Sequence, residues 1–145
     1  MLIGVPKEIK NHEYRVGMAP ASVREAVTHG HQVMVQANAG EGISASDDEY
    51  RAVGAQIVDD PQEIFASAEM IVKVKEPLAE EFTRMREGQI MFTYLHLAAS
   101  RELTEAMIAT GSHCFAYETL EVGRTLPLLT PMSEEKRTRF INNIL

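Results

Sequence analysis

The sequence contains no tryptophan, a single cysteine and no long apolar run. One cysteine cannot form an internal disulfide bond, and the position of Cys114 inside a short apolar run predicts a buried structural thiol. No apolar stretch approaches the roughly 18 residues of a membrane-spanning helix, and the N-terminus lacks the pattern of a signal peptide. We therefore expect a cytoplasmic protein without a membrane-spanning segment.

Positive charge is also scarce. Lys and Arg number 14 against 21 Asp and Glu, so the formal net charge is -7. A chain of this charge repels phosphate backbones, and no nucleic-acid partner is expected. His29 and His31 lie on either side of Gly30 and lack a Cys, Asp or Glu at metal-ligand spacing, so the sequence predicts no metal site.

The remaining composition is that of an ordinary globular domain, with 45% hydrophobic and 24% charged residues in 145. Apolar runs typical of β-strands alternate with amphipathic helical segments along the chain. This alternation predicts an α/β fold, Rossmann-like or flavodoxin-like, in which helices flank a mostly parallel sheet. No linker divides the chain before about Pro127, so one domain is expected.

The expected elements follow from apolar runs and helix-terminal residues. Ser46 begins a capping box with Glu49, and Pro61 occupies the first position of another helix, so helices are expected to begin there. The other expected helices are Pro20–Thr28, Leu78–Met85 and Arg101–Thr110. The expected strands are Leu2–Val5, His31–Gln36, Ala55–Val58, Met70–Lys75, Gln89–Leu95 and Ser112–Tyr117.

Three side chains that can carry positive charge, Arg15, Lys75 and His96, lie at or just past the ends of predicted strands. Ligands of open parallel α/β sheets bind outside the carboxyl ends of the strands, so these residues can converge on one crevice. An arginine, a lysine and a histidine together suit a small keto or amino acid. Arginine is the best carboxylate ligand of the three because it donates two parallel hydrogen bonds.

Each of these residues also has a structural interpretation. Arg15 shares its loop with other charged residues and could be a solvated surface charge. Lys73 and Lys75 share one face of a predicted strand, and both could reach solvent at its end, since an unpaired buried lysine is costly. His96 lies in an apolar run, which favours the neutral imidazole of a general acid or base but equally fits a core histidine.

A glycine pattern at residues 40–45, GEGISA, matches a dinucleotide-binding fingerprint. The match is weak because the expected helix cap, Ser46, comes after it rather than within it. Acidic residues beside the glycines would also repel a pyrophosphate. We interpret the segment as a turn that needs glycine.

Several segments together carry a more specific signal. They are IGVPKE, EYRVGMAPASV, AGEGISASDDEY, VKVKEP, YLHLAAS, AYET and LPLLTPMSE, in this order from Met1 to about Glu134. Taken together they resemble the N-terminal substrate domain of bacterial alanine dehydrogenase, a family that also includes a transhydrogenase subunit.

The resemblance implies a substrate domain over residues 1–130 and an NAD-dependent, reversible deamination of L-alanine to pyruvate and ammonia. It implies that Arg15 and Lys75 bind the substrate and that His96 transfers protons. It places Ser133 near the nucleotide, and it implies a homo-oligomer. The alternatives are the nucleotide-binding subunit of a proton-translocating transhydrogenase and a non-catalytic module that binds a small acid or supports assembly.

The chain departs from the family after Glu134. Residues 131–145 are interpreted as the start of an interdomain segment with an atypical tail, in which the family pattern is lost. No NAD fingerprint occurs, so NAD is expected to bind mainly to a Rossmann domain that this sequence lacks. The chain alone is therefore expected to be inactive.

Overall fold

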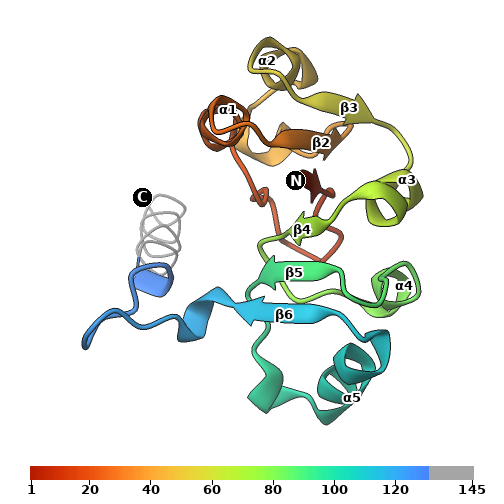
Figure 1. Ribbon diagram of the computed structural model, residues 1–145, viewed down its shortest axis with the longest axis vertical. Helices are drawn as coiled ribbons and strands as arrows, with labels where there is room; N and C mark the ends of the chain where they lie inside the picture. The colour runs from red at the N-terminus through yellow and green to blue at the C-terminus, as the bar shows by residue number, and fades with distance from the viewer. Residues whose placement is uncertain (131–145) are drawn as a thin grey trace.

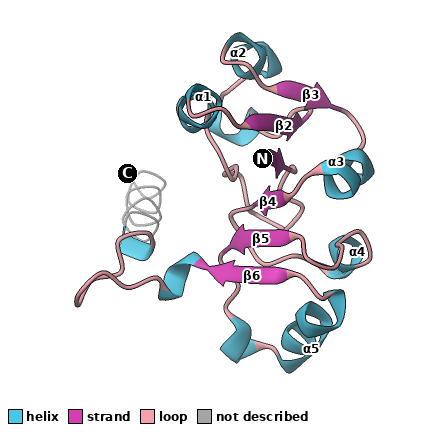
Figure 2. Cartoon of the chain, viewed as in Figure 1, coloured by secondary structure: helices cyan, strands magenta, loops and turns pink. Residues whose placement is uncertain are grey.

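The computed structural model describes residues 1–130, which form one six-stranded sheet with the strand order β3-β2-β1-β4-β5-β6 (Figure 1). All five strand pairs are parallel. Helices cover both faces of the sheet, as a parallel sheet requires (Figure 2). The predicted α/β fold is confirmed. The strands are β1 (Leu2–Val5), β2 (Gln32–Gln36), β3 (Gln56–Val58), β4 (Met70–Val72), β5 (Ile90–Thr93) and β6 (His113–Ala116).

The α-helices begin and end largely where the sequence predicts. They are α1 (Pro20–Thr28), α2 (Asp47–Ala52), α3 (Pro61–Ser67), α4 (Ala79–Phe82) and α5 (Arg101–Thr110). The Ser46 hydroxyl accepts a hydrogen bond from the Glu49 amide, and the Glu49 carboxylate accepts one from the Ser46 amide. This reciprocal capping box starts α2 as predicted. Only α4 is much shorter than expected.

The core divides into two apolar clusters, one on each face of the sheet. Val23 of α1 and Tyr50 of α2 pack against β1 and β2 on one face. Phe65 of α3 and Met107 of α5 belong to the cluster on the other face. No helix that the structure describes is both long and apolar enough to cross a membrane.

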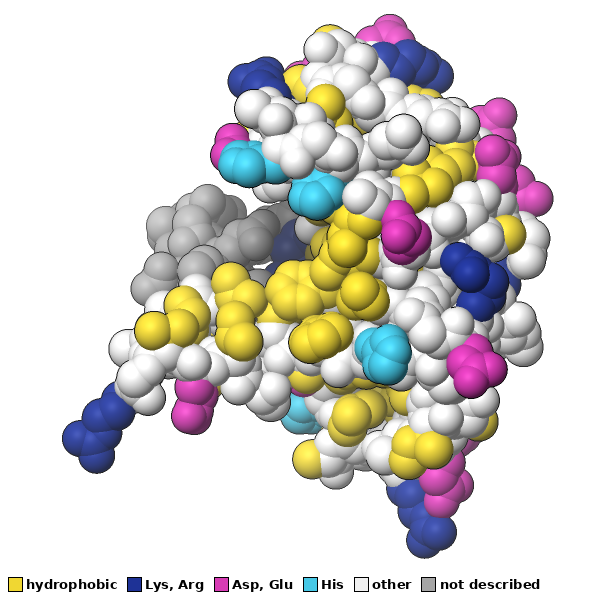
Figure 3. Space-filling view, in the orientation of Figure 1, with side chains coloured by type: hydrophobic (Ala, Val, Ile, Leu, Met, Phe, Trp, Pro, Cys, Tyr) yellow, Lys and Arg dark blue, Asp and Glu magenta, His cyan; other side chains and the backbone are white. Residues whose placement is uncertain are grey.

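The half of the sheet formed by β4, β5 and β6 is less completely covered than the other half. Phe115 of β6 is 55% exposed, and Figure 3 shows a band of apolar side chains across the middle of this view. Cys114, on the same strand, is half-buried. The prediction of a buried thiol was therefore wrong, because β6 is an edge strand with only one neighbour.

Strands β4 and β5 end earlier than the sequence predicts. Val74 donates its backbone N–H to the Glu8 carboxylate, at 2.6 Å, instead of to a neighbouring strand. Beyond β5, the backbone N–H groups of Leu95 and His96 donate to the carboxylate of Glu118. In both cases a distant carboxylate takes the place of the ladder partner, and the chain leaves the sheet.

The strand order places a switch point between β1 and β4. From β1 the chain continues to β2 and β3 on one side, and from β4 it continues to β5 and β6 on the other. In folds of this kind ligands bind outside the carboxyl ends of the strands at that point. The segments that follow β1, β4, β5 and β6 all lie at this edge, because the strands are parallel.

Candidate functional site

Arg15 lies in the loop that connects β1 to α1, and it is buried rather than solvated. Its Nε and Nη2 atoms donate to the two carboxylate oxygens of Glu13, at 2.8 and 2.6 Å, and its backbone N–H donates to Glu13 as well. Burial raises the pKa of Glu13, but the hydrogen bonds and charge of Arg15 outweigh it, so the pKa is lower than usual. The guanidinium is therefore held in one orientation.

Lys75 follows the end of β4 and is held through its backbone. Its carbonyl oxygen accepts a hydrogen bond of 2.8 Å from the Thr93 hydroxyl on β5. Its ammonium lies 4.7 Å from the ring centroid of Tyr94, within the range of a cation–π interaction. The positive charge of Lys75 also contributes to the lowered pKa of Glu13, so the lysine lies near the Arg15 pair.

His96 follows β5 in a left-handed backbone conformation, with φ of 50°, which is uncommon for a residue other than glycine. The Glu118 carboxylate fixes this conformation by accepting from the His96 backbone N–H at 2.7 Å. The imidazole is stacked on the Tyr94 ring, and its Nδ1 lies 3.2 Å from the Tyr94 hydroxyl. The predicted apolar setting is wrong: the positive φ turns the residue outward, and His96 is exposed.

Sequence reasoning missed two side chains that interact with the three predicted site residues. Tyr94 contacts both Lys75 and His96, and Glu13 joins Arg15 to the electrostatic surroundings of Lys75. Tyr94 lies near the end of the predicted strand Gln89–Leu95, two residues before His96, a placement that could have identified it. The pairing of Glu13 with Arg15 could not be found in this way, because most residues at positions 7–15 of the loop are charged or polar.

Lys73 is buried and paired, so the interpretation that it reaches solvent was wrong. Its ammonium lies 2.5 Å from Glu81 of α4 and 3.5 Å from Glu8 of the β1–α1 loop. Burial raises the pKa of Glu8, while the charge of Lys73 and the Val74 amide oppose that rise. These two carboxylates stabilise the buried cation in place of water.

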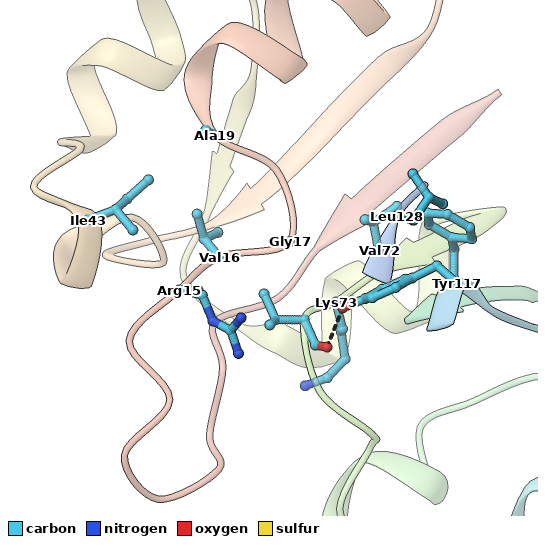
Figure 4. A pocket seen from close by; sticks show the side chains of 11 residues that line it. Arg15, Val16, Gly17, Ala19, Ile43, Val72, Lys73, Tyr117 and Leu128 are labelled. Carbon is cyan, nitrogen blue, oxygen red and sulfur yellow. Dashed lines mark hydrogen bonds between the residues drawn. The ribbon is translucent and has the colours of Figure 1, made fainter. Parts of the chain in front are cut away.

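A cavity of about 440 Å³ opens beside this cluster (Figure 4). Arg15 and Gly17 line one side, and Val72 and Tyr117 line another. The Tyr117 hydroxyl donates a 2.5 Å hydrogen bond to the Val74 carbonyl oxygen, drawn as a dashed line in Figure 4. Burial raises the pKa of Tyr117, so it stays a neutral donor.

A second cavity, of about 310 Å³, lies on the other side of Arg15. Arg15 and Glu13 border it together with Lys7 and Glu41. Within the described part of the chain, Lys75 and His96 line neither cavity. Arg15 is the one residue that lines both of these two cavities.

Gly17 brings the β1–α1 loop into contact with the end of β4. A Cβ atom at this position would lie 2.3 Å from the carbonyl oxygen of Val72, which is backbone and cannot move aside cheaply. We expect Gly17→Ala to lower the free energy of unfolding by about 3 kcal/mol, the upper end of overpacking costs. Urea unfolding followed by circular dichroism measures this. A loss no larger than that of Ala19→Ser, on the same loop, would contradict it.

The glycine pattern at residues 40–45 forms a tightly packed turn. A Cβ atom at Gly42 would lie 2.1 Å from the Tyr14 carbonyl oxygen, and one at Gly40 would lie 2.6 Å from that of Ala45. These glycines thus permit close backbone packing instead of a pyrophosphate contact. Residues 1–130 contain no group of three His, Cys, Asp or Glu that could hold a metal ion. Ser133 and the tail at 131–145 lie outside the described residues.

Comparison with known proteins identifies close relatives. A family model described as "Alanine dehydrogenase/PNT, N-terminal domain" matches residues 4–135. Alanine dehydrogenase of Mycolicibacterium smegmatis is 52% identical over 135 residues, which are 92% of this chain and 36% of that protein. This chain thus spans about a third of the length of such relatives.

Solved structures agree with this result. An L-alanine dehydrogenase structure has a TM-score of 0.89 and 54% identity, over 92% of this chain and 37% of that one. A transhydrogenase structure from Sinorhizobium meliloti is more distant, with a TM-score of 0.78 and 29% identity over 83% of this chain and 36% of that one. The chain therefore belongs to the family of alanine dehydrogenase and PNT N-terminal domains.

Proposed function

We propose that this chain is the substrate-binding domain of an NAD-dependent L-alanine dehydrogenase. The proposed reaction converts L-alanine, water and NAD⁺ to pyruvate, ammonium, NADH and one proton, and it is reversible. The observation that carries the proposal is the placement of Arg15, Lys75 and His96 at the carboxyl edge of the sheet, where Glu13 orients Arg15 and Tyr94 contacts both Lys75 and His96. Identity of 54% to an L-alanine dehydrogenase structure supports it over the transhydrogenase alternative, at 29%.

The proposed roles follow from the chemistry of the three side chains. Arg15, oriented by Glu13, binds the substrate carboxylate with charge-assisted hydrogen bonds. Lys75 stabilises the negative charge that develops on the substrate oxygen as the carbinolamine forms and collapses. His96 accepts a proton from the attacking water and returns it during collapse. Its exposed position allows exchange of that proton with solvent.

The proposal assigns NAD to residues other than those described. The glycine pattern at residues 40–45 packs against backbone, and the roles given above involve none of the atoms of NAD. Pyruvate is accordingly the ligand that this chain should recognise by itself. NADH should have little effect on the described residues.

An amide NMR titration tests the proposal. Pyruvate should shift signals of Arg15, Lys75 and His96, whereas propionate, which lacks the keto oxygen, should bind more weakly because Lys75 has no oxygen to contact. NADH, added in a separate titration, should leave these signals in place. A well-dispersed spectrum that is indifferent to pyruvate would contradict the proposed function and would favour an assembly module.

A further inference from the structure

Three buried charged side chains meet behind the proposed substrate site: Glu8, Lys73 and Glu81. Their side chains are only 1% to 2% exposed. They come from three different elements, since Glu8 belongs to the β1–α1 loop, Lys73 follows β4 and Glu81 lies in α4. None of them is among the residues to which the proposed reaction assigns a role.

The two carboxylates of this triad also hold the backbone on either side of Lys75. One Glu8 oxygen accepts from the backbone N–H of Val74 at 2.6 Å, and one Glu81 oxygen accepts from that of Leu78 at 2.9 Å. The Lys75 backbone also interacts favourably with the ionised Glu8 carboxylate. The short segment that carries Lys75 is thus fixed at both ends, and Lys73 holds the two carboxylates together.

Glu8 also belongs to the loop that carries Arg15. The same loop reaches the Lys75 segment through an ion pair between Lys10 and Glu76 and through the close approach of Gly17 to Val72. Of these contacts, only the one made by Glu8 lies in the buried interior and reaches the backbone next to Lys75. Glu8 therefore joins the loop that carries Arg15 to the segment that carries Lys75.

Stability alone does not account for this arrangement, because a buried set of charges is often no more stable than apolar residues of similar volume. The charges instead hold the backbone segments in defined positions, because charge-assisted hydrogen bonds restrict both the distance between two groups and its direction. We propose that Glu8 is a positioning residue that fixes the Lys75 ammonium relative to the Arg15 guanidinium. This inference rests on the proposed function of those two side chains.

The variant Glu8→Gln separates positioning from folding. It leaves Lys73 paired with Glu81, so the interior keeps one positive and one negative charge and the chain folds. Glutamine has a single carbonyl oxygen, which cannot serve both the Val74 amide and the Lys73 ammonium, and its amide group would face a cation. The glutamine carbonyl oxygen is therefore expected to turn toward the Lys73 ammonium, so that the Val74 amide loses its acceptor and the backbone of the Lys75 segment is released at one end.

The expected readouts are two NMR signatures and one affinity. In the unliganded chain, the Tyr94 ring shifts the Lys75 ε-methylene protons upfield, because the ammonium lies 4.7 Å from its centroid. In Glu8→Gln this shift falls to half or less, and the Val74 amide proton moves upfield as its short hydrogen bond weakens. Pyruvate binds about tenfold more weakly, since displacement of one ligand by about 1 Å has large effects.

The matched control is Glu80→Gln, which removes an exposed carboxylate from the same helix as Glu81. It should change none of the three readouts. A Glu8→Gln chain that keeps the wild-type Lys75 shift would overturn the positioning role. So would one that loses the shift and still binds pyruvate within twofold of wild type.

Failure of the proposed function has a different signature. If the wild-type chain binds no pyruvate, the substrate assignment is wrong. The Lys75 shift in unliganded Glu8→Gln still decides the positioning role: its loss supports the role, and its persistence overturns it.

Discussion

Arg15→Ala should abolish detectable pyruvate binding. Each charge-assisted hydrogen bond contributes about 1.5 to 3 kcal/mol, so the loss of two from the substrate carboxylate corresponds to at least about a hundredfold weaker binding. The structure supports a large effect because the guanidinium is buried and oriented by Glu13 before any ligand arrives. Isothermal titration calorimetry with pyruvate measures this loss.

Three further variants make the result specific to the role of Arg15. Arg15→Lys keeps a cation beside Glu13 but cannot form the bidentate contact, so it should bind about tenfold or more weakly while remaining folded. Arg24→Ala, which removes an exposed arginine from α1, should bind like wild type. His96→Ala should largely spare binding, because His96 is assigned to proton transfer. Equal losses for Arg15→Ala and His96→Ala would contradict these roles.

The sequence predicts the fold well because the fold depends on local signals. Apolar runs, the capping box at Ser46 and the proline at the start of α3 determine where elements begin, and each acts within a few residues. The ends of β4 and β5 were not predicted, because the carboxylates that replace the ladder come from Glu8 and Glu118. These residues lie 66 and 22 positions away from the amides of Val74 and His96.

The candidate site was likewise predicted where it depends on local sequence and missed where it depends on the folded chain. Position after predicted strands selected Arg15, Lys75 and His96, because this requires only the approximate ends of the apolar runs. The contacts of Tyr94 with two of them depend on how the chain turns after β5, which a left-handed residue determines. No local pattern predicts that conformation for a histidine, and the expectation of an apolar imidazole was therefore wrong.

Lys73 is the clearest example of a residue whose contacts local sequence patterns cannot predict. Its partners Glu8 and Glu81 belong to elements that only the folded chain brings together. Lys73→Met should lower the free energy of unfolding by about 3 to 5 kcal/mol near neutral pH, since it leaves two buried carboxylates without a cation. Lys10→Met is the matched control. Lys10 pairs with Glu76 but is partly exposed, so its loss should cost about 1 kcal/mol or less.

The loss in free energy of unfolding caused by Lys73→Met, its stability deficit, should also depend on pH. Burial raises the pKa of Glu8 above its ordinary value of 4.5, and Lys73 opposes that rise, so removing the lysine raises the pKa further. A carboxyl group with a raised pKa in the folded chain favours folding at low pH, and that contribution is lost as pH rises through the folded pKa. The deficit should therefore be larger at about pH 8 than at about pH 5. Urea unfolding of wild type and Lys73→Met at both pH values measures this difference. A deficit that does not change with pH, or one no larger than that of Lys10→Met, would show that Lys73 does not neutralise the buried carboxylates.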